Sequence, residues 1–557
     1  PKSATTTPTK HSNPESPPML ATWFDRTFSD LRNQFRWSFL PPLMVYFAAG
    51  IQGLTSIVGV FFVKDYLGLS AEFLTSLTFW TVLPWTLKMP LGHLVDIIWR
   101  WKAILVYLGA SLLAASLSIM YGLITSPEEM RAYMPVEYWY VLSTLLAPCG
   151  YVLQDVVADG MAVEAVPATD DQGNEIDETR LKVQHTTMQT LGRIALFTGY
   201  VSVALVNIFM FDGIEQKSEA EKVTIYGQIY FAALIIPLVS ISGVLLASFL
   251  KQKRRVALRA MGMAKDAITD LVDRTGDPTT PNMWFFGGGL VFVILSLTVG
   301  LGNVVGAKEI VFVASLAIII FMMRMLAKEL TPAKAKMLFG TAIVVFIFRA
   351  MPSPGPGLGW FEIDVLKFDQ QFLAVLSLIT AFLALAGMIV LRPLMAEKPI
   401  NTIIIILTIT STILFVPSIA LYYGIHNWTS SFTGGVVDAR FIAILDTAIE
   451  APLGQIAVIP LLAWIARNAP TNLKATFFAV MASFINLALS AGSLLTTYLN
   501  KVFTITREVK NADTGTIEVA ANYDQLGYLL IAVLIITFVA PLAAIYIVQR
   551  SPLKTFD

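Results

Sequence analysis

The chain has 557 residues, of which 55% are hydrophobic and only 14% are charged, and its formal net charge is zero. A soluble domain carries about 25% charged residues, so this composition excludes an ordinary soluble fold. The balanced charge also leaves no basic footprint of the kind that nucleic-acid binding requires.

Residue types that build catalytic and metal sites are scarce. Cys149 is the one cysteine, which excludes an intramolecular disulfide and a multi-cysteine metal site. The four histidines show no metal-ligand spacing, and no Ser-His-Asp set can be assembled. We therefore predict a protein that is not an enzyme and that holds no cofactor and no metal.

Apolar runs long enough to cross a bilayer recur from end to end, and the mean hydropathy is +0.67. Runs of about 20 apolar residues are typical of membrane helices, whereas a β-barrel would show alternating segments of about 10 residues, which are absent. The pattern predicts an all-α membrane protein with fourteen transmembrane helices. We expect them at residues 40–63, 72–92, 103–124, 138–160, 187–210, 225–250, 283–302, 308–327, 337–352, 371–392, 401–423, 437–466, 473–499 and 524–549.

The helices divide into two groups of six with a pair inserted between them. A short pattern at 61–63 and 72–74 recurs at 360–362 and 371–373, and Ala-Pro followed by Gly recurs at 147–150 and 451–454. A repeat of this kind predicts two parallel halves, the plan of the major facilitator superfamily. The expected segments are an N-terminal tail with an interfacial helix (1–39), a first half (40–250), a basic cytoplasmic loop (251–282), two inserted helices (283–327), a second half (328–550) and a C-terminal tail (551–557).

Lysine and arginine concentrate in the loops on the side of the N-terminus. The positive-inside rule therefore predicts that both termini are cytoplasmic. No cleavable signal peptide is visible. The expected location is a bacterial inner membrane or an organelle membrane of the chloroplast type, whose stroma or matrix is the equivalent side.

Charged residues inside the spans gather on the helices that line the central cavity of that superfamily, the first and fourth of each half. Asp155 and Asp159 are four residues apart and share one helical face, as do Asp446 and Glu450 in the matching helix. Arg349 lies on the first helix of the second half. A carboxylate in hydrocarbon is costly and usually faces a water path or a partner. The plainer alternatives are that Asp155 and Asp159 lie in the cytoplasm, and that Asp446 and Glu450 only bridge to Arg440 or Arg349.

Three segments resemble the folate-biopterin transporter family. Residues 84–96, with Trp85, Lys88 and Asp96, are similar to that family's second helix. Residues 154–159 with Glu164 resemble its fourth-helix signature, and residues 351–373 resemble the start of its second half. The resemblance implies a transporter of folates, pterins or related organic anions, commonly proton-coupled. The family's usual plan has twelve helices, so this chain would be a fourteen-helix variant.

From these residues we expect a site for an organic anion in the cavity. Arg349, helped by Arg193 or Lys88, would hold a substrate carboxylate, and Trp85 and Phe361 would stack on a flat heterocycle. Arg193 could instead pair with Asp155 or Asp159 as a gate. The candidate proton-coupling and gating acids are Asp155, Asp159, Asp446, Glu450, Asp96 and Glu164.

The expected partners are a small organic anion, protons and the lipid bilayer, with no nucleic acid. Two alternatives stay open from the residues alone. The first is a transporter of another organic solute. The second is a non-transporting accessory or assembly subunit, whose inserted helices dock on a membrane-protein partner.

Overall fold

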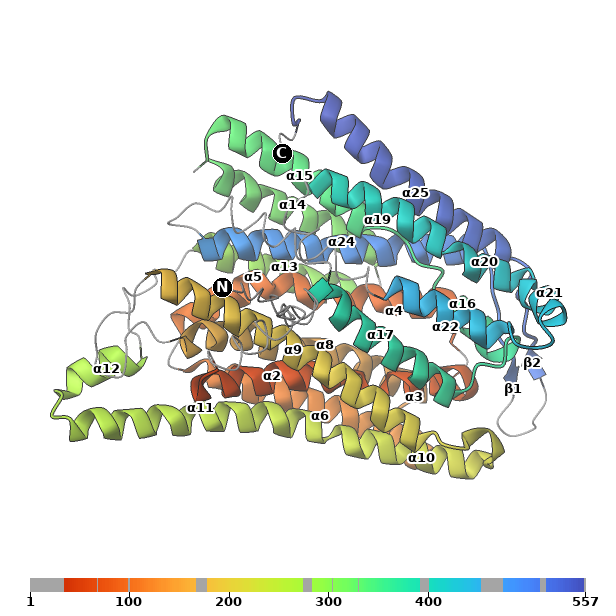
Figure 1. The fold of residues 1–557 in the computed structure, drawn as a ribbon, viewed down its shortest axis with the longest axis horizontal. Helices are drawn as coiled ribbons and strands as arrows, with labels where there is room; N and C mark the ends of the chain where they lie inside the picture. Colours follow the sequence, from red (N-terminus) through yellow and green to blue (C-terminus); the bar gives the residue numbers. More distant parts are fainter. Residues whose placement is uncertain are drawn as a thin grey trace, which may run out of the picture.

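A computed structural model describes residues 35–67, 69–98, 101–166, 178–273, 283–302, 304–328, 330–390, 400–451, 474–510 and 517–554. Its helices lie mostly along one direction and form a broad bundle (Figure 1). Nine of the described helical segments are long and apolar enough to cross a membrane by length and composition. The all-α membrane fold is thereby confirmed, while the count of fourteen spans stays a prediction.

We call the helices from η1 to α11 the first half. They are η1 (Trp37–Phe39), α2 (Leu40–Ile51), η2 (Gln52–Thr55), α3 (Ser56–Tyr66), α4 (Ala71–Val82), η3 (Leu83–Leu87), α5 (Lys88–Ile97), α6 (Ala103–Thr125), α7 (Pro127–Tyr133), α8 (Val136–Ala165), α9 (Glu178–Met210), η5 (Ile214–Gln216), α10 (Glu219–Ala233) and α11 (Ile235–Ala260). A core of buried apolar side chains from residues 48–236 holds most of them together.

Three helices follow, α12 (Lys265–Asp273), α13 (Met283–Leu301) and α14 (Ala307–Ala327). We call the rest the second half: α15 (Pro332–Arg349), α16 (Pro356–Asp364), α17 (Gln370–Val390), α19 (Ile400–Leu414), α20 (Val416–Tyr422), α21 (Ile425–Phe432), α22 (Ala439–Glu450), α24 (Lys474–Val502) and α25 (Leu526–Arg550). A short antiparallel hairpin of β1 (Val509–Lys510) and β2 (Ile517–Val519) lies between the last two helices, and no expectation from the sequence foresaw it.

The first helix of each half is broken at a matching point. In the first half, η2 separates α2 from α3. In the second half, residues 350–355 separate α15 from α16, because Pro352 and Pro354 lack backbone N–H groups and Gly355 has a φ of +77°. The expected span 337–352 is therefore wrong in extent, since the helix resumes beyond the break and ends at Asp364.

The expected loop after residue 250 is also partly wrong, because α11 continues as a helix to Ala260. Lys, Gln, Arg, Ala and Leu in 251–260 all favour a helix, and Gly262, with a φ of +79°, lies just past its end. Helix α12 packs back on this extension through Leu258, Ile268 and Val272. The interfacial helix expected before residue 40 lies outside the described residues, except for 35–39.

Glycines allow the helices of the first half to approach closely. A Cβ atom on Gly50 of α2 would lie 2.2 Å from the Leu196 carbonyl oxygen of α9, and one on Gly199 would lie 2.6 Å from the Gly50 Cα. Gly109 of α6 and Gly150 of α8 make a similar contact, because a Cβ on either would lie 2.5 Å from the carbonyl oxygen of the other. These contacts bring α9 close to α2 and α8 close to α6.

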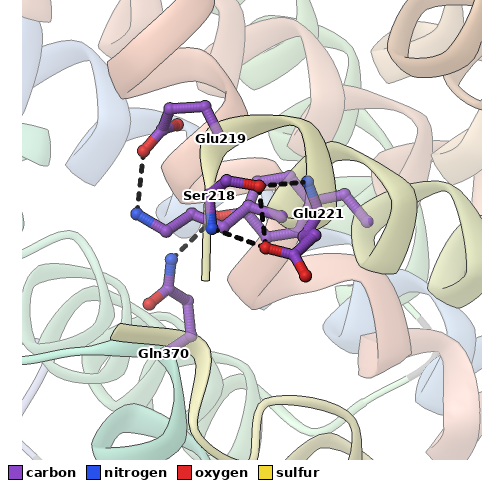
Figure 2. A network of polar contacts seen from close by, with 6 residues as sticks. Ser218, Glu219, Glu221 and Gln370 are labelled. Atoms are coloured by element: carbon purple, nitrogen blue, oxygen red, sulfur yellow. Dashed lines mark hydrogen bonds and ion pairs between the residues drawn. The ribbon is translucent and has the colours of Figure 1, made fainter. Parts of the chain in front are cut away.

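Polar contacts join the two halves at one end of the bundle, the end that carries β1, β2 and α21 in Figure 1. We call it the outer end, because the predicted orientation puts it opposite the termini. The Lys64 Nζ lies 2.6 Å from an Asp364 oxygen. The Gln370 amide on α17 donates to the Tyr226 hydroxyl at 2.7 Å, beside the capping box of Ser218 and Glu221 that starts α10 (Figure 2). The outer end is therefore closed in this conformation.

Candidate functional site

Lys88 is at the centre of a charge cluster in the first half. Its Nζ lies 2.6 Å from Asp155 Oδ2 and 2.8 Å from Asp159 Oδ2, and the Tyr46 hydroxyl donates to Asp159 Oδ1 at 2.9 Å. The lysine starts α5, the two acids lie one turn apart on α8, and the tyrosine belongs to α2. The shared helical face expected for Asp155 and Asp159 thus brings both carboxylates to one ammonium group.

A break in the second expected span positions the lysine. Pro84 falls in η3, a 3-10 turn between α4 and α5 that ends directly before Lys88. The carbonyl oxygen of Trp85 in the same turn accepts a hydrogen bond from the Asn486 amide of α24 at 3.1 Å. A residue of the second half therefore holds the turn that presents Lys88 and Trp85.

A cavity of about 160 Å³ adjoins this cluster. Its polar and aromatic lining consists of Tyr46, Gln52, Trp85, Tyr151, Gln154, Asp155, Tyr200 and Ser240. All of its lining residues lie between positions 45 and 240. The expected cavity was to be lined by four helices, two from each half. Of these, α2 and α8 line the described cavity, while α15, α16 and the described part of α22 do not.

The second half holds carboxylates in a different setting. Glu362 of α16 lies within electrostatic range of Asp446 of α22, and Asp446 lies within range of Glu450. Among the described residues, neither the buried Asp446 Oδ1 nor the buried Arg349 Nε has a hydrogen-bond partner. Arg349 ends α15 just before the helix break. These groups occupy the helices that the sequence predicts as cavity helices.

The plainer alternative for Asp446 and Glu450 included a bridge to Arg440, and the structure gives Arg440 other partners. Its guanidinium lies 2.7 Å from Asp369 and 3.3 Å from Glu215. Glu215 follows α9 in the first half, whereas Asp369 and Arg440 belong to the second half. Arg440 is therefore part of the polar contacts that close the outer end.

The remaining expected residues are spread over the molecule. Arg193 of α9 is exposed and lies within electrostatic range of Asp155. Phe361 is 5% exposed and packs against the Tyr422 and Tyr523 rings in a core cluster, away from the cavity lining. Asp96 lies on α5 and Glu164 on α8, and their side chains fall outside the described ones.

Several residues at the site were not among the expected ones. Tyr151 and Gln154 line the cavity together with the expected Asp155. Their spacing of three and four residues places the three side chains on one face of α8. That spacing from Asp155 could have predicted Tyr151 and Gln154. Tyr46 and Glu362 carried no comparable signal, because their importance depends on a neighbour far away in the chain.

Solved structures with the same arrangement of helices are membrane transporters. A POT family transporter in complex with 5-aminolevulinic acid has a TM-score of 0.60 at 12% identity, over 93% of this chain and 96% of that chain. A POT family transporter in complex with a thioalcohol conjugated peptide has a TM-score of 0.58 at 12% identity, over 92% and 96%. The nucleoside transporter NupG has a TM-score of 0.52 at 10% identity, over 92% and 99%. The chain therefore has the fold of these proteins, which is that of the major facilitator superfamily.

The family is shown by sequence. The model of the BT1 family matches residues 49–555, and the chain belongs to that family. One relative is the folate-biopterin transporter of Synechocystis sp. (strain ATCC 27184 / PCC 6803 / Kazusa), which is 23% identical over 480 residues, covering 84% of this chain and 76% of the relative. The resemblance drawn from residues 84–96, 154–164 and 351–373 is confirmed.

Proposed function

We propose that this transporter carries a folate- or pterin-like organic anion by alternating access, coupled to proton movement. The observation that carries the proposal is the position of Lys88, held between two carboxylates beside a cavity with aromatic walls. The family of the chain and the name of its relative support the same substrate class.

The cavity suits the head group of such a molecule. Trp85 and three tyrosines offer flat apolar faces, and Gln154 and Asp155 offer polar edges. A pterin ring presents amine and amide N–H groups along one edge, which a carboxylate accepts well. A volume of about 160 Å³ is small beside the about 300–1,000 Å³ of sites for whole drug-sized ligands. We therefore place the bicyclic ring here and an acidic tail towards Arg349.

The charge cluster suggests how proton and anion are linked. With both aspartates ionised, Lys88 is fully engaged and offers nothing to a substrate. A proton on Asp155 leaves Asp159 paired with Lys88 and frees one N–H of the ammonium group for a substrate oxygen. Loss of the proton restores the pair and displaces the substrate. A proton and a monoanion bound together leave the net charge of the cluster unchanged, which limits the cost of charging a site in low dielectric.

Uptake of labelled folate and of a reduced pterin into proteoliposomes tests this function. The protein would be compared as wild type, as Asp155→Asn and as Asp266→Asn, with and without an inward acid gradient. Asp266 is exposed on α12, far along the chain from the cavity, so it is the matched control. We expect gradient-driven uptake by the wild type and by Asp266→Asn. In Asp155→Asn we expect a loss of about tenfold or more, since one general acid–base group contributes about 10²–10⁴-fold in comparable proton transfers.

The possible outcomes separate the parts of the proposal. Uptake by Asp155→Asn that no longer responds to the gradient would support the proposed substrate class and the role of this acid in proton coupling. Uptake that needs no gradient even in the wild type would remove proton coupling. If neither compound enters liposomes that contain well-folded protein, the substrate class is wrong.

A further inference from the structure

The inserted helices α13 and α14 lie where the two halves meet. In Figure 1 they appear in the middle of the bundle, beside α5 and α24. They also contact each other, because the Trp284 and Phe321 rings are 5.6 Å apart and a Cβ on Gly288 would lie 3.3 Å from the Ile318 side chain. The pair is therefore a hairpin packed within the transporter, and each helix has a different neighbour.

Helix α13 packs along α4 and α5, the two helices that form the second expected span of the first half. The Phe286 ring lies 5.1 Å from the His93 ring of α5. Further along, a Cβ on Gly289 would lie 2.8 Å from Pro90, and one on Gly300 would lie 3.1 Å from the Trp80 ring of α4. Two glycines thus let α13 lie directly against the first half.

Helix α14 belongs to the core of the second half. Ile319, Met322 and Met323 are buried in one cluster with side chains of α15, α24 and α25. Phe312 packs against this cluster and also against Ala350, Ala488 and Ala491. The hairpin therefore has one leg on each half.

One buried cluster contains all three parts of the protein. Phe79 and Leu83 come from the first half, Phe292 and Val311 from the hairpin, and Leu494 from the second half. Phe79 and Val311 are each 0% exposed. Separating the halves here would uncover a continuous apolar core rather than a wet interface.

At the outer end, two adjacent residues of the hairpin each bond to a different half. The Lys308 ammonium donates to the Ser76 hydroxyl of α4 at 2.7 Å. The next residue, Glu309, accepts a hydrogen bond from the Tyr498 hydroxyl of α24. Lys501 of α24 lies over the Tyr498 ring and 3.3 Å from Glu72 of α4. The start of α14 is thus bonded to both halves at once.

We propose that the inserted hairpin is an internal clamp that holds the outer ends of α4 and α24 together and so favours the outward-closed conformation. Alternating access requires these ends to separate, which breaks the contacts of Lys308 or Glu309 and opens the mixed apolar cluster. The clamp concerns the conformational equilibrium and needs no particular substrate.

A thiol reporter of opening tests the clamp without any substrate. Ala374 of α17 is 0% exposed and is buried among side chains of the first half, so a cysteine there reacts only when the halves separate. The reporter is Ala374→Cys in a Cys149→Ala background, labelled with a water-soluble maleimide in lipid nanodiscs. Lys308→Met with Glu309→Met should speed labelling by about tenfold, because each lost hydrogen bond shifts such an equilibrium by several-fold.

The control is Arg131→Met with Glu128→Met, which replaces one basic and one acidic residue in the same way but breaks an ion pair, 3.3 Å long, that lies within α7 alone. Its labelling rate should stay at the wild-type value. Phe292→Ala, which acts on the mixed apolar cluster, should also speed labelling. An unchanged rate in the Lys308/Glu309 variant, or an equal rise in the control, would overturn the proposal. Size-exclusion profiles and full labelling after denaturation show that each variant is folded and reactive.

Discussion

The two halves treat their membrane carboxylates differently. In the first half, Asp155 and Asp159 share the ammonium group of Lys88 and border a cavity. In the second half, Asp446 lies within electrostatic range of Glu362 and of Glu450, and its Oδ1 lacks a hydrogen-bond partner among the described residues. Removing one member of a paired set leaves an uncompensated charge, whereas removing one member of a set of like charges relieves repulsion. Of the four predictions that follow, those on Lys88 and Asp446 test this contrast, and those on Gly50 and Glu215 test the packing of the first half and its contact with the second.

Lys88→Met should have the largest effect. Removing one partner of a mostly buried ion pair leaves two carboxylates without their cation, which costs about 3–5 kcal/mol. We expect a lower free energy of unfolding and a lower melting temperature in detergent. Adding Asp155→Asn and Asp159→Asn to the Lys88→Met variant should recover much of that loss. Arg131→Met, which breaks an exposed pair on α7, should cost about 1 kcal/mol or less. An unchanged melting temperature in Lys88→Met would show that the cluster adds no stability.

Gly50→Ala comes next. The added methyl group would lie 2.2 Å from the Leu196 carbonyl oxygen, so α2 and α9 would have to move apart, at a cost of about 1–3 kcal/mol. Gly359 of α16 is the control in the second half, because a Cβ there meets nothing within 4 Å. Gly359→Ala should be neutral or stabilising by up to about 1 kcal/mol. Equal melting temperatures for the two variants would contradict the close packing of α2 on α9.

Asp446→Asn should change stability in the opposite direction from Lys88→Met. Replacing this carboxylate removes its repulsion of Glu362 and Glu450, so we expect a gain of about 1 kcal/mol or less. Uptake should fall at the same time if the group carries protons. Thermal unfolding and uptake of the same preparation give both values. A loss of about 2 kcal/mol would instead indicate a cation partner for Asp446 in the folded protein.

The smallest expected effect concerns pH at the outer end. A hydrogen bond with Asp369 and the charge of that acid raise the pKa of Glu215 above its ordinary value, and Arg440 opposes this only in part. A raised pKa means that the closed contact binds a proton more tightly than the open one. The contact is therefore strongest at acid pH and weakens as the pH rises through the raised pKa.

Labelling of Ala374→Cys should accordingly be faster at neutral than at mildly acid pH, beyond the intrinsic change in thiol reactivity. Dividing each rate by that of the same reporter in Glu215→Gln removes the intrinsic change. A ratio that does not vary with pH would exclude Glu215 as the group responsible.

The sequence predicted the fold and part of the site because the strongest signals are local. Long apolar runs predict membrane helices, and acids four residues apart predict a shared face, so Asp155 and Asp159 could be paired in advance. The partner of those acids was harder to foresee. Lys88 was expected to hold a substrate, because nothing in its own neighbourhood shows that η3 turns it towards α8.

Other features depend on distant contacts and could not be predicted. Arg440 has several acids within reach along the chain, and only the packing of the halves selects Glu215 and Asp369. Tyr46 is an ordinary aromatic residue of an apolar helix until α8 brings Asp159 to its hydroxyl. The extension of α11 to Ala260 was missed for another reason: its charges were interpreted as a loop, although the same residues favour a helix.

The rod formed by α10 and α11 has a consequence for the membrane itself. Residues 219–260 form one candidate span of 42 residues, which is about 63 Å long at 1.5 Å per residue. The hydrocarbon layer is only about 30 Å thick, so the rod must incline steeply or protrude. Phe249 is exposed just before Lys251, which sets the depth at which the rod leaves the lipid. A thinner or thicker bilayer would then change the tilt of this rod and of the helices that pack on it.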